Sequence, residues 1–102
     1  MQEKNIDDIA RANDWGSPKT LERHFDDHGV ETNSKNLEDY AKKARDLYNK
    51  RGSINSKTDS DGITRVYDDT TGLFGAYNRD GSSRAIFKPT KEKDYWNRQP
   101  GK

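Results

Sequence analysis

The spacing of the apolar residues changes halfway along the chain, and this change limits the fold more than any other feature of the sequence. From Asn36 to Arg51 apolar residues recur every three or four positions, the period of an amphipathic helix, and Gly52 ends the pattern. After a polar stretch that reaches Gly62, apolar and polar residues alternate, as they do in half-buried strands. Helices come first and a sheet follows, which predicts an α+β fold.

Short alternating runs predict three strands, over residues 63–67, 73–77 and 83–88. Gly81 occupies the hairpin position that favours positive φ, and Pro89 ends the third strand. Strands joined by short turns form an antiparallel meander, and we expect one face of it to pack against the helices. Residues 52–62 are predicted to be a polar loop. Its Asp59–Gly62 run suggests a calcium loop, but Thr70 stands where the bidentate glutamate would be, so a turn is the better interpretation.

Both histidines of the chain lie in one short predicted helix, from about Pro18 to His28. Ser17 and Pro18 are typical of a helix start, and Gly29 is typical of the position just past a helix end. Four residues fall on one face of this helix at i, i+3, i+4 and i+7, namely Leu21, His24, Phe25 and His28. If this face of the helix packs on the sheet, we expect the two imidazoles to lie at the edge of the helix–sheet contact.

Three interpretations of the histidine pair remain open. Each ring can be a hydrogen-bonded residue at the edge of the core. A zinc site is disfavoured, because Phe25 stands where a zincin helix needs glutamate, and the chain has no cysteine and no third histidine. Acid-base chemistry requires cations beside the rings that steady a developing negative charge.

Composition narrows the class of protein. We expect one domain over residues 1–102, with residues 1–16 as a short helix or an arm. With 27% hydrophobic and 36% charged residues, the stability of this domain is expected to be marginal and to benefit from a partner. The 19 basic and 18 acidic residues nearly cancel, so no strong general attraction to nucleic acid or anionic membrane is expected. The chain has no cysteine, and we expect neither a signal peptide nor a segment that spans a bilayer in it.

The predicted sheet carries Arg65, Arg84 and Lys88 at or near strand ends. If Ile63 and Tyr67 turn toward the helices, Arg65 lies in the groove with the histidines, because alternate residues of a strand share a face. Imidazoles and cations without a carboxylate cluster suit metal-free RNA cleavage. In that reaction a base takes the 2′-hydroxyl proton, cations stabilise the phosphorane, and an acid protonates the leaving 5′-oxygen.

A series of short motifs supports this interpretation by resemblance. The series begins with His28-Gly29-Val30-Glu31, and the amphipathic helix that carries Tyr40 and Ala44 follows it. The later motifs are, in order, Arg65-Val66-Tyr67, Gly72-Leu73-Phe74-Gly75, Asn78-Arg79-Asp80-Gly81, Phe87-Lys88-Pro89 and Tyr95-Trp96. From about Leu21 to Gln99, the chain resembles the C-terminal toxin domains of contact-dependent growth inhibition and related bacterial polymorphic toxins. More narrowly, it is similar to the colicin D-like ribonucleases of the barnase/EndoU/colicin/RelE superfamily.

The resemblance implies N-terminal helices on a small antiparallel sheet, and a metal-independent tRNA endonuclease without a cofactor. It further implies delivery from the surface of a producing cell into the cytoplasm of a neighbouring bacterium, and neutralisation by a cognate immunity protein. No membrane contact of the domain itself is implied. Since the near-neutral charge offers RNA little attraction, an elongation factor that presents tRNA is a further expected partner.

The resemblance also suggests roles for single residues. The catalytic histidine of colicin D-like domains ends an early helix, a position held here by His28. Asp26 and Asp27 stand where the family often has lysines, which shifts phosphate binding to other cations. The candidate catalytic residues are therefore His28, Arg65, Lys88, His24 and Thr71, and the candidate substrate-binding residues are Arg23, Arg84 and Trp96, with no metal ligand. Trp96 has an alternative role as a plug that closes the core.

Two alternative functions stay open. One is a non-enzymatic interaction domain whose histidines are structural. The other is a toxin of the same delivery system that attacks DNA, which normally requires a metal site.

Overall fold

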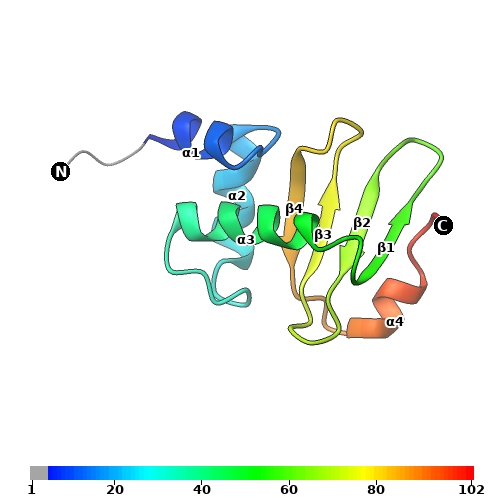
Figure 1. The fold of residues 1–102 in the computed structure, drawn as a ribbon. Coiled ribbons are helices and arrows are strands. Elements are labelled where there is room, and N and C mark those ends of the chain that lie inside the picture. The colour runs from blue at the N-terminus through cyan, green and yellow to red at the C-terminus, as the bar shows by residue number, and fades with distance from the viewer. Residues whose placement is uncertain (1–4) are drawn as a thin grey trace.

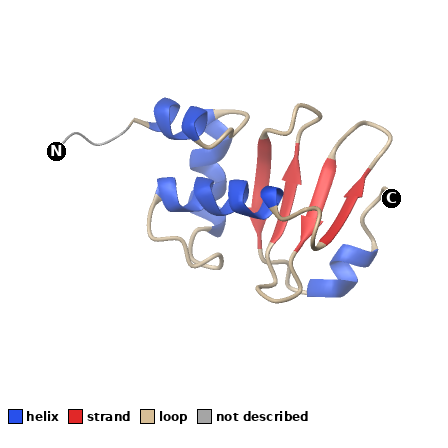
Figure 2. Cartoon of the chain, viewed as in Figure 1, coloured by secondary structure: helices blue, strands red, loops and turns tan. Residues whose placement is uncertain are grey.

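Residues 5–102, the part of the chain that the computed structural model describes, form four helices and one four-stranded antiparallel sheet (Figures 1 and 2). The helices are α1 (Ile6–Ala12), α2 (Pro18–His28), α3 (Leu37–Asn49) and α4 (Glu92–Asn97). The strands are β1 (Asn55–Thr58), β2 (Thr64–Tyr67), β3 (Phe74–Tyr77) and β4 (Ser83–Phe87), and they pair in the order β1-β2-β3-β4. The predicted α+β class, with helices before the sheet, is confirmed.

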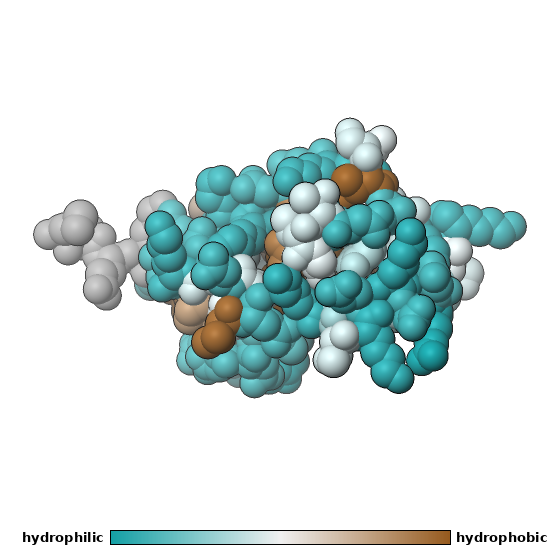
Figure 3. Space-filling view, turned by 90° about the horizontal axis from the view of Figure 1, so that it is seen from below, coloured by the Kyte–Doolittle hydropathy of each residue, from teal (hydrophilic) through white to brown (hydrophobic). Residues whose placement is uncertain are grey.

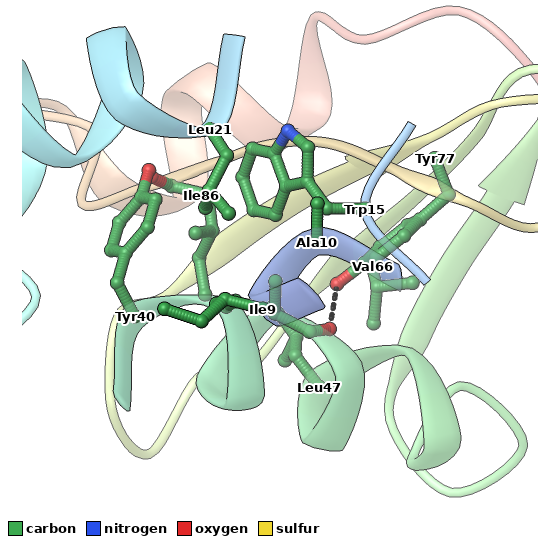
Figure 4. Close-up of a cluster of buried hydrophobic side chains, with 11 residues drawn as sticks. Ile9, Ala10, Trp15, Leu21, Tyr40, Leu47, Val66, Tyr77 and Ile86 are labelled. Atoms are coloured by element: carbon green, nitrogen blue, oxygen red, sulfur yellow. Dashed lines mark hydrogen bonds between the residues drawn. The ribbon is translucent and has the colours of Figure 1, made fainter. Parts of the chain in front are cut away.

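The helices cover both faces of the sheet. Helix α3 crosses in front of the strands and α2 lies beside β4, whereas α4 lies at the opposite end of the molecule from α1 and α2 (Figure 1). The main core cluster contains Val66, Tyr77 and Ile86 from the sheet together with residues of α1, α2 and α3 (Figure 4). A second cluster on the other face joins Tyr67 and Phe74 to Trp96 of α4. The space-filling view in Figure 3 is largely hydrophilic, with small separate hydrophobic patches.

Local chemistry explains the two long helices. Helix α2 has the predicted bounds, with an extended N-cap at Ser17 and a C-cap at Gly29. A Cβ at Gly29 would lie 2.8 Å from Cε1 of Phe25, so the glycine allows the Phe25 ring to fold under the helix end. Helix α3 starts where the Asn36 side chain accepts a hydrogen bond from the Asp39 amide at 2.8 Å. Both ends of α3 lie within two residues of the predicted range.

Strand β1 lies in the stretch that was predicted to be a loop, and that prediction was wrong. Its four residues, Asn55–Thr58, include no apolar side chain, so they carry no alternating pattern to recognise. The strand is held by backbone pairing with β2, and Lys102 exchanges two backbone hydrogen bonds with Thr58 on its outer edge. The turn predicted at Asp59–Gly62 is present, since the Asp59 carboxylate accepts from the amides of Asp61 and Ile63.

Residues 5–16 and the C-terminal stretch are more ordered than their composition indicates, while residues 1–4 of the expected short helix or arm lie outside the described residues. Helix α1 is a helix and not an arm, and it buries Ile9 and Ala10 in the main core. Helix α4 buries Trp96, which is 5% exposed and stacks on Tyr67 with ring centroids 6.1 Å apart. Trp96 therefore closes the second core cluster.

Replacing Trp96 by alanine should lower the free energy of unfolding by about 3–5 kcal/mol, because it empties the space between α4 and the sheet. Trp96→Phe keeps a ring against Tyr67 and Phe74 and should lose clearly less. Urea unfolding of the three proteins measures this. Wild-type stability in Trp96→Ala would show that the ring does not close the core.

Candidate active site

The two histidines lie against each other on the side of α2 that faces β4. The ring centroids of His24 and His28 are 6.0 Å apart and the rings are inclined by 19°. His24 also approaches the Trp15 ring at 6.3 Å, and His28 approaches the Phe87 ring of β4 at 5.4 Å. The prediction that the two imidazoles share one face at the rim of the core is confirmed.

A carboxylate stands beside His28. Oε1 of Glu31 lies 3.1 Å from Nδ1 of His28, at ion-pair distance but without the alignment of a hydrogen bond. The other oxygen, Oε2, accepts a hydrogen bond from the backbone N–H of Lys88 at 2.9 Å. Glu31 thus joins the end of α2 to the end of β4 at the point where His28 reaches the surface. Glu31 belongs to the His28-Gly29-Val30-Glu31 motif, from which no role for the glutamate was predicted.

His28 opens onto a groove of about 340 Å³, called here the His28 groove. Cations from the segment after β4 line this groove beside the imidazole, namely Lys88, Lys91 and Arg98. Tyr95 and Thr90 add hydroxyl groups. Lys91, Tyr95 and Arg98 were not proposed from sequence, because the C-terminal stretch has no pattern that directs its side chains toward α2.

His24 belongs to a second cavity of about 370 Å³ at the other end of α2, called here the Arg84 pocket. It brings together residues from the start of α2 and from the β3–β4 hairpin, namely Gly16, Ser17, Thr20, Arg23, His24, Asn78, Ser83 and Arg84. Strand β4 runs from Ser83 in this pocket to Phe87 in the His28 groove. The two cavities therefore follow each other along α2 and β4, with the histidine pair between them.

The surroundings of His24 favour its neutral form. Burial lowers the pKa of the imidazole below its ordinary value, and the charges of Arg23 and His28 lower it further, against an opposing effect of Asp27. Nδ1 of His24 is shielded from solvent and has no hydrogen-bond partner among the described residues. A neutral imidazole can accept a proton at neutral pH, which is the property a general base needs.

Arg65 does not join the histidines. Its guanidinium binds the Asp59 carboxylate at 2.7 Å, and this hydrogen bond is the main cause that lowers the pKa of Asp59. The expected placement required Tyr67 to face the N-terminal helices, but Val66 faces them instead. Since alternate residues of a strand share a face, Arg65 points with Tyr67 to the side covered by α4.

Thr71 and Trp96 also lie apart from the histidine pair. Thr71 lies in the β2–β3 turn, where its hydroxyl accepts from the Leu73 amide, and it lines a small cavity beside α3. Trp96 is buried in the second core cluster and leaves little ring surface for a base. The structure gathers the other five candidates around α2 and β4, namely Arg23, His24, His28, Arg84 and Lys88.

Comparisons with known proteins add no family to this picture: no family model matches the chain, and no curated protein sequence matches it. Within residues 5–102, no helix has both the length and the apolar composition needed to cross a membrane. In the same part of the chain, no three histidine, aspartate or glutamate side chains converge in a way that could hold a metal ion. The functional proposal therefore depends on the geometry around the two histidines.

The lowered pKa of His24 predicts a pH-dependent stability. As the pH falls through about 6.5, the unfolded chain takes up the His24 proton before the folded chain does, so the free energy of unfolding decreases. His24→Gln should therefore lose less stability than the wild type between about pH 7.5 and about pH 5.5. Urea unfolding at both pH values tests this, with Lys19→Gln on the same helix as a control. An equal loss in His24→Gln would contradict the assignment.

Proposed function

We propose that this protein is a metal-independent endoribonuclease that cleaves tRNA as a bacterial toxin domain. The observation that carries the proposal is the pair of stacked histidines, 6.0 Å apart, with cations on both sides of it. Arg23 and Arg84 lie on the His24 side, and Lys88 lies on the His28 side. This set supplies two groups for proton transfer and positive charge for a phosphorane.

The two imidazoles take the two proton-transfer roles of this reaction. His24, whose pKa is lowered, takes the proton from the 2′-hydroxyl, and the oxygen so activated attacks the adjacent phosphorus. His28, beside the Glu31 carboxylate, gives its proton to the 5′-oxygen as the P–O5′ bond breaks. The products are a 2′,3′-cyclic phosphate and a free 5′-hydroxyl, so the RNA supplies its own nucleophile. Two rings one helical turn apart can contact the attacking and the leaving oxygen of one phosphate.

Glu31 is a positioning residue in this scheme. Its second oxygen is held by the Lys88 backbone N–H, so the carboxylate keeps a fixed place beside the His28 ring. The Lys88 side chain lines the same groove and can neutralise charge on the phosphate. Because the His28 side chain is 28% exposed while its Nδ1 is shielded, other atoms of the side chain face the solvent and an incoming RNA.

The assignment of tRNA as the substrate, and of the biological setting, follows from the resemblance to toxin domains in the order of the sequence motifs. On this proposal the domain is delivered from a producing cell into the cytoplasm of a neighbouring bacterium, and a cognate immunity protein protects the producer. The nearly balanced charge of 19 basic and 18 acidic residues supports a need for help in RNA capture, for which an elongation factor that presents tRNA is suited.

One observation favours the second candidate function, an interaction domain with structural histidines. Both rings are partly buried and pack on aromatic residues, His24 on Trp15 and His28 on Phe87. Such contacts would stabilise the α2–β4 packing without any catalysis. The two candidate functions make different predictions for a protein that lacks one imidazole. An endoribonuclease loses RNA cleavage, whereas an interaction domain cleaves no RNA with or without the imidazole.

The decisive experiment incubates purified protein with total tRNA in EDTA and resolves the RNA on a denaturing gel. Wild-type protein should give discrete fragments that end in a cyclic phosphate. His28→Ala should lower the cleavage rate by at least about 100-fold while it keeps the wild-type fold by circular dichroism. Lys88→Ala should also cut more slowly, because a phosphate loses its cation.

Lys42→Ala is the matched control, since this exposed lysine of α3 pairs with Asp46 outside both cavities. It should cut like the wild type. Intact tRNA with every protein, also after addition of bacterial extract, would favour the interaction domain. Fragments that appear only with added metal would mean that the chemistry proposed here is wrong.

A further inference from the structure

One wall of the His28 groove is apolar and largely aromatic. Phe87, Pro89 and Tyr95 line it, and the groove volume of about 340 Å³ lies in the range of about 300–1,000 Å³ that is typical of small-ligand sites. The Phe87 ring also contacts the His28 ring, with centroids 5.4 Å apart and an inclination of 34°. The apolar wall is therefore continuous with the imidazole to which the proposed function gives the role of general acid.

Tyr95 is fixed in place, but no other ring covers it. Its ring contacts those of Phe74 at 5.1 Å and Phe87 at 5.6 Å, and both contacts are nearly perpendicular, at 85° and 78°. Within residues 5–102, no ring stacks in parallel on Tyr95 and no cation lies over it. Tyr95 is half-buried and lines the groove, so part of its ring surface is open to a ligand. Open aromatic surface of this kind stacks on nucleobases.

The orientation of α4 decides which of two neighbouring aromatic residues can stack on a base. Successive residues of a helix point about 100° apart around its axis. Trp96 faces the second core cluster and is 5% exposed, whereas Tyr95 turns toward the groove. Tyr95 rather than Trp96 therefore has ring surface to offer to a base.

Polar groups without partners surround the apolar wall. The Tyr95 hydroxyl makes no hydrogen bond within residues 5–102 and is not shielded from solvent. Three cations line the groove and form no ion pair with a described residue, namely Lys88, Lys91 and Arg98. Glu31 is the single carboxylate among the lining residues. An occupant with a flat aromatic body and negative charge fits this lining, and a nucleotide has both.

We infer that the His28 groove binds one unpaired nucleobase, which stacks on Tyr95, while Lys91 and Arg98 neutralise the adjoining phosphate charge. Its role in cleavage rests on the proposed function, in which His28 protonates the leaving 5′-oxygen. That oxygen belongs to the nucleotide on the 3′ side of the cleaved bond. The base in the groove is therefore the one that follows the cleaved bond, and a base that stacks on Tyr95 cannot at the same time be stacked within an RNA duplex.

The first test needs no catalysis. Adenosine 5′-monophosphate (AMP) and ribose 5-phosphate, which lacks the base, are titrated separately into the protein and followed by NMR. The Tyr95 signals should shift with AMP, which should bind about tenfold more tightly than ribose 5-phosphate. Tyr95→Leu should remove this difference, because leucine keeps apolar packing on Phe74 and Phe87 but offers no ring to the base. Tyr95→Phe should retain it.

Tyr48→Leu is the matched control, since Tyr48 is also half-buried but lines a different cavity. It should bind AMP like the wild type, and circular dichroism checks that each variant is folded. Equal affinity of the wild type for AMP and ribose 5-phosphate would overturn the base subsite. So would an equal loss of AMP affinity in Tyr95→Leu and Tyr48→Leu.

A second pair of variants tests the cations. Arg98→Gln should weaken the binding of AMP and of ribose 5-phosphate alike, by about threefold, because both compounds carry a phosphate. Lys93→Gln should weaken neither, since this exposed lysine of α4 does not line the groove. Equal affinities in Arg98→Gln and Lys93→Gln would overturn the role of Arg98.

The second test separates a base of an RNA strand from a free nucleotide. The value of kcat/KM is measured for the cleaved tRNA and for the same tRNA without the base on the 3′ or on the 5′ side of the cleaved bond. Tyr95→Leu should lower kcat/KM about tenfold on the complete tRNA and on the tRNA that lacks the 5′ base. It should have little effect on the tRNA that lacks the 3′ base, because the stacking partner is already absent. A tenfold loss there as well would overturn the assignment to the 3′ base.

The two proposals can fail separately. AMP binding that depends on Tyr95, without any RNA cleavage, would support the groove as a site for a free nucleotide and would refute the endoribonuclease. RNA cleavage with equal kcat/KM in Tyr95→Leu and Tyr48→Leu would keep the endoribonuclease and refute the base subsite.

Discussion

The packing of α2 along the edge strand β4 is the interaction on which the site depends. Leu21 of α2 is fully buried in the main core, and Trp15, just before the helix, pairs in parallel with Ser83 at the start of β4. This arrangement holds the helix at both ends, because Glu31 beyond its C-terminus binds the Lys88 amide beyond β4. A helix held in this way places its two histidines in series between two cavities.

Tyrosines support this packing in a chain with few apolar residues. The Tyr40 hydroxyl donates to the carbonyl of Ile86 in β4, and the Tyr77 hydroxyl donates to the carbonyl of Ala44 in α3 at 2.7 Å. Burial raises the pKa of both phenols far above the usual range, so they remain neutral donors. Each ring thus fills core volume and also satisfies a backbone carbonyl, which lets a protein with 27% hydrophobic residues hold helices on its sheet (Figure 4).

The proposed chemistry is spread over segments that are distant along the chain. The imidazoles come from α2, Arg84 comes from the start of β4, and further cations come from both ends of α4 and the segment before it. Both cavities are lined by an excess of cations: the Arg84 pocket has two arginines and no carboxylate, and the His28 groove has Lys88, Lys91 and Arg98 against Glu31. A substrate phosphate would accordingly find positive charge on both sides of the histidine pair.

Local patterns alone determined the helices around the histidines and the meander of β2, β3 and β4, because capping residues, turn glycines and the periods of 3.6 and 2 act over a few neighbours. The shared face of His24 and His28 follows from the same helical period. Only the tertiary structure decided that Val66 rather than Arg65 faces α1–α3, that polar residues 55–58 pair as a strand, and that Arg23 and Arg84 meet in one pocket. These outcomes depend on which surfaces of the sheet and helices bury each other, and packing between residues far apart in the sequence leaves no local period from which to read it.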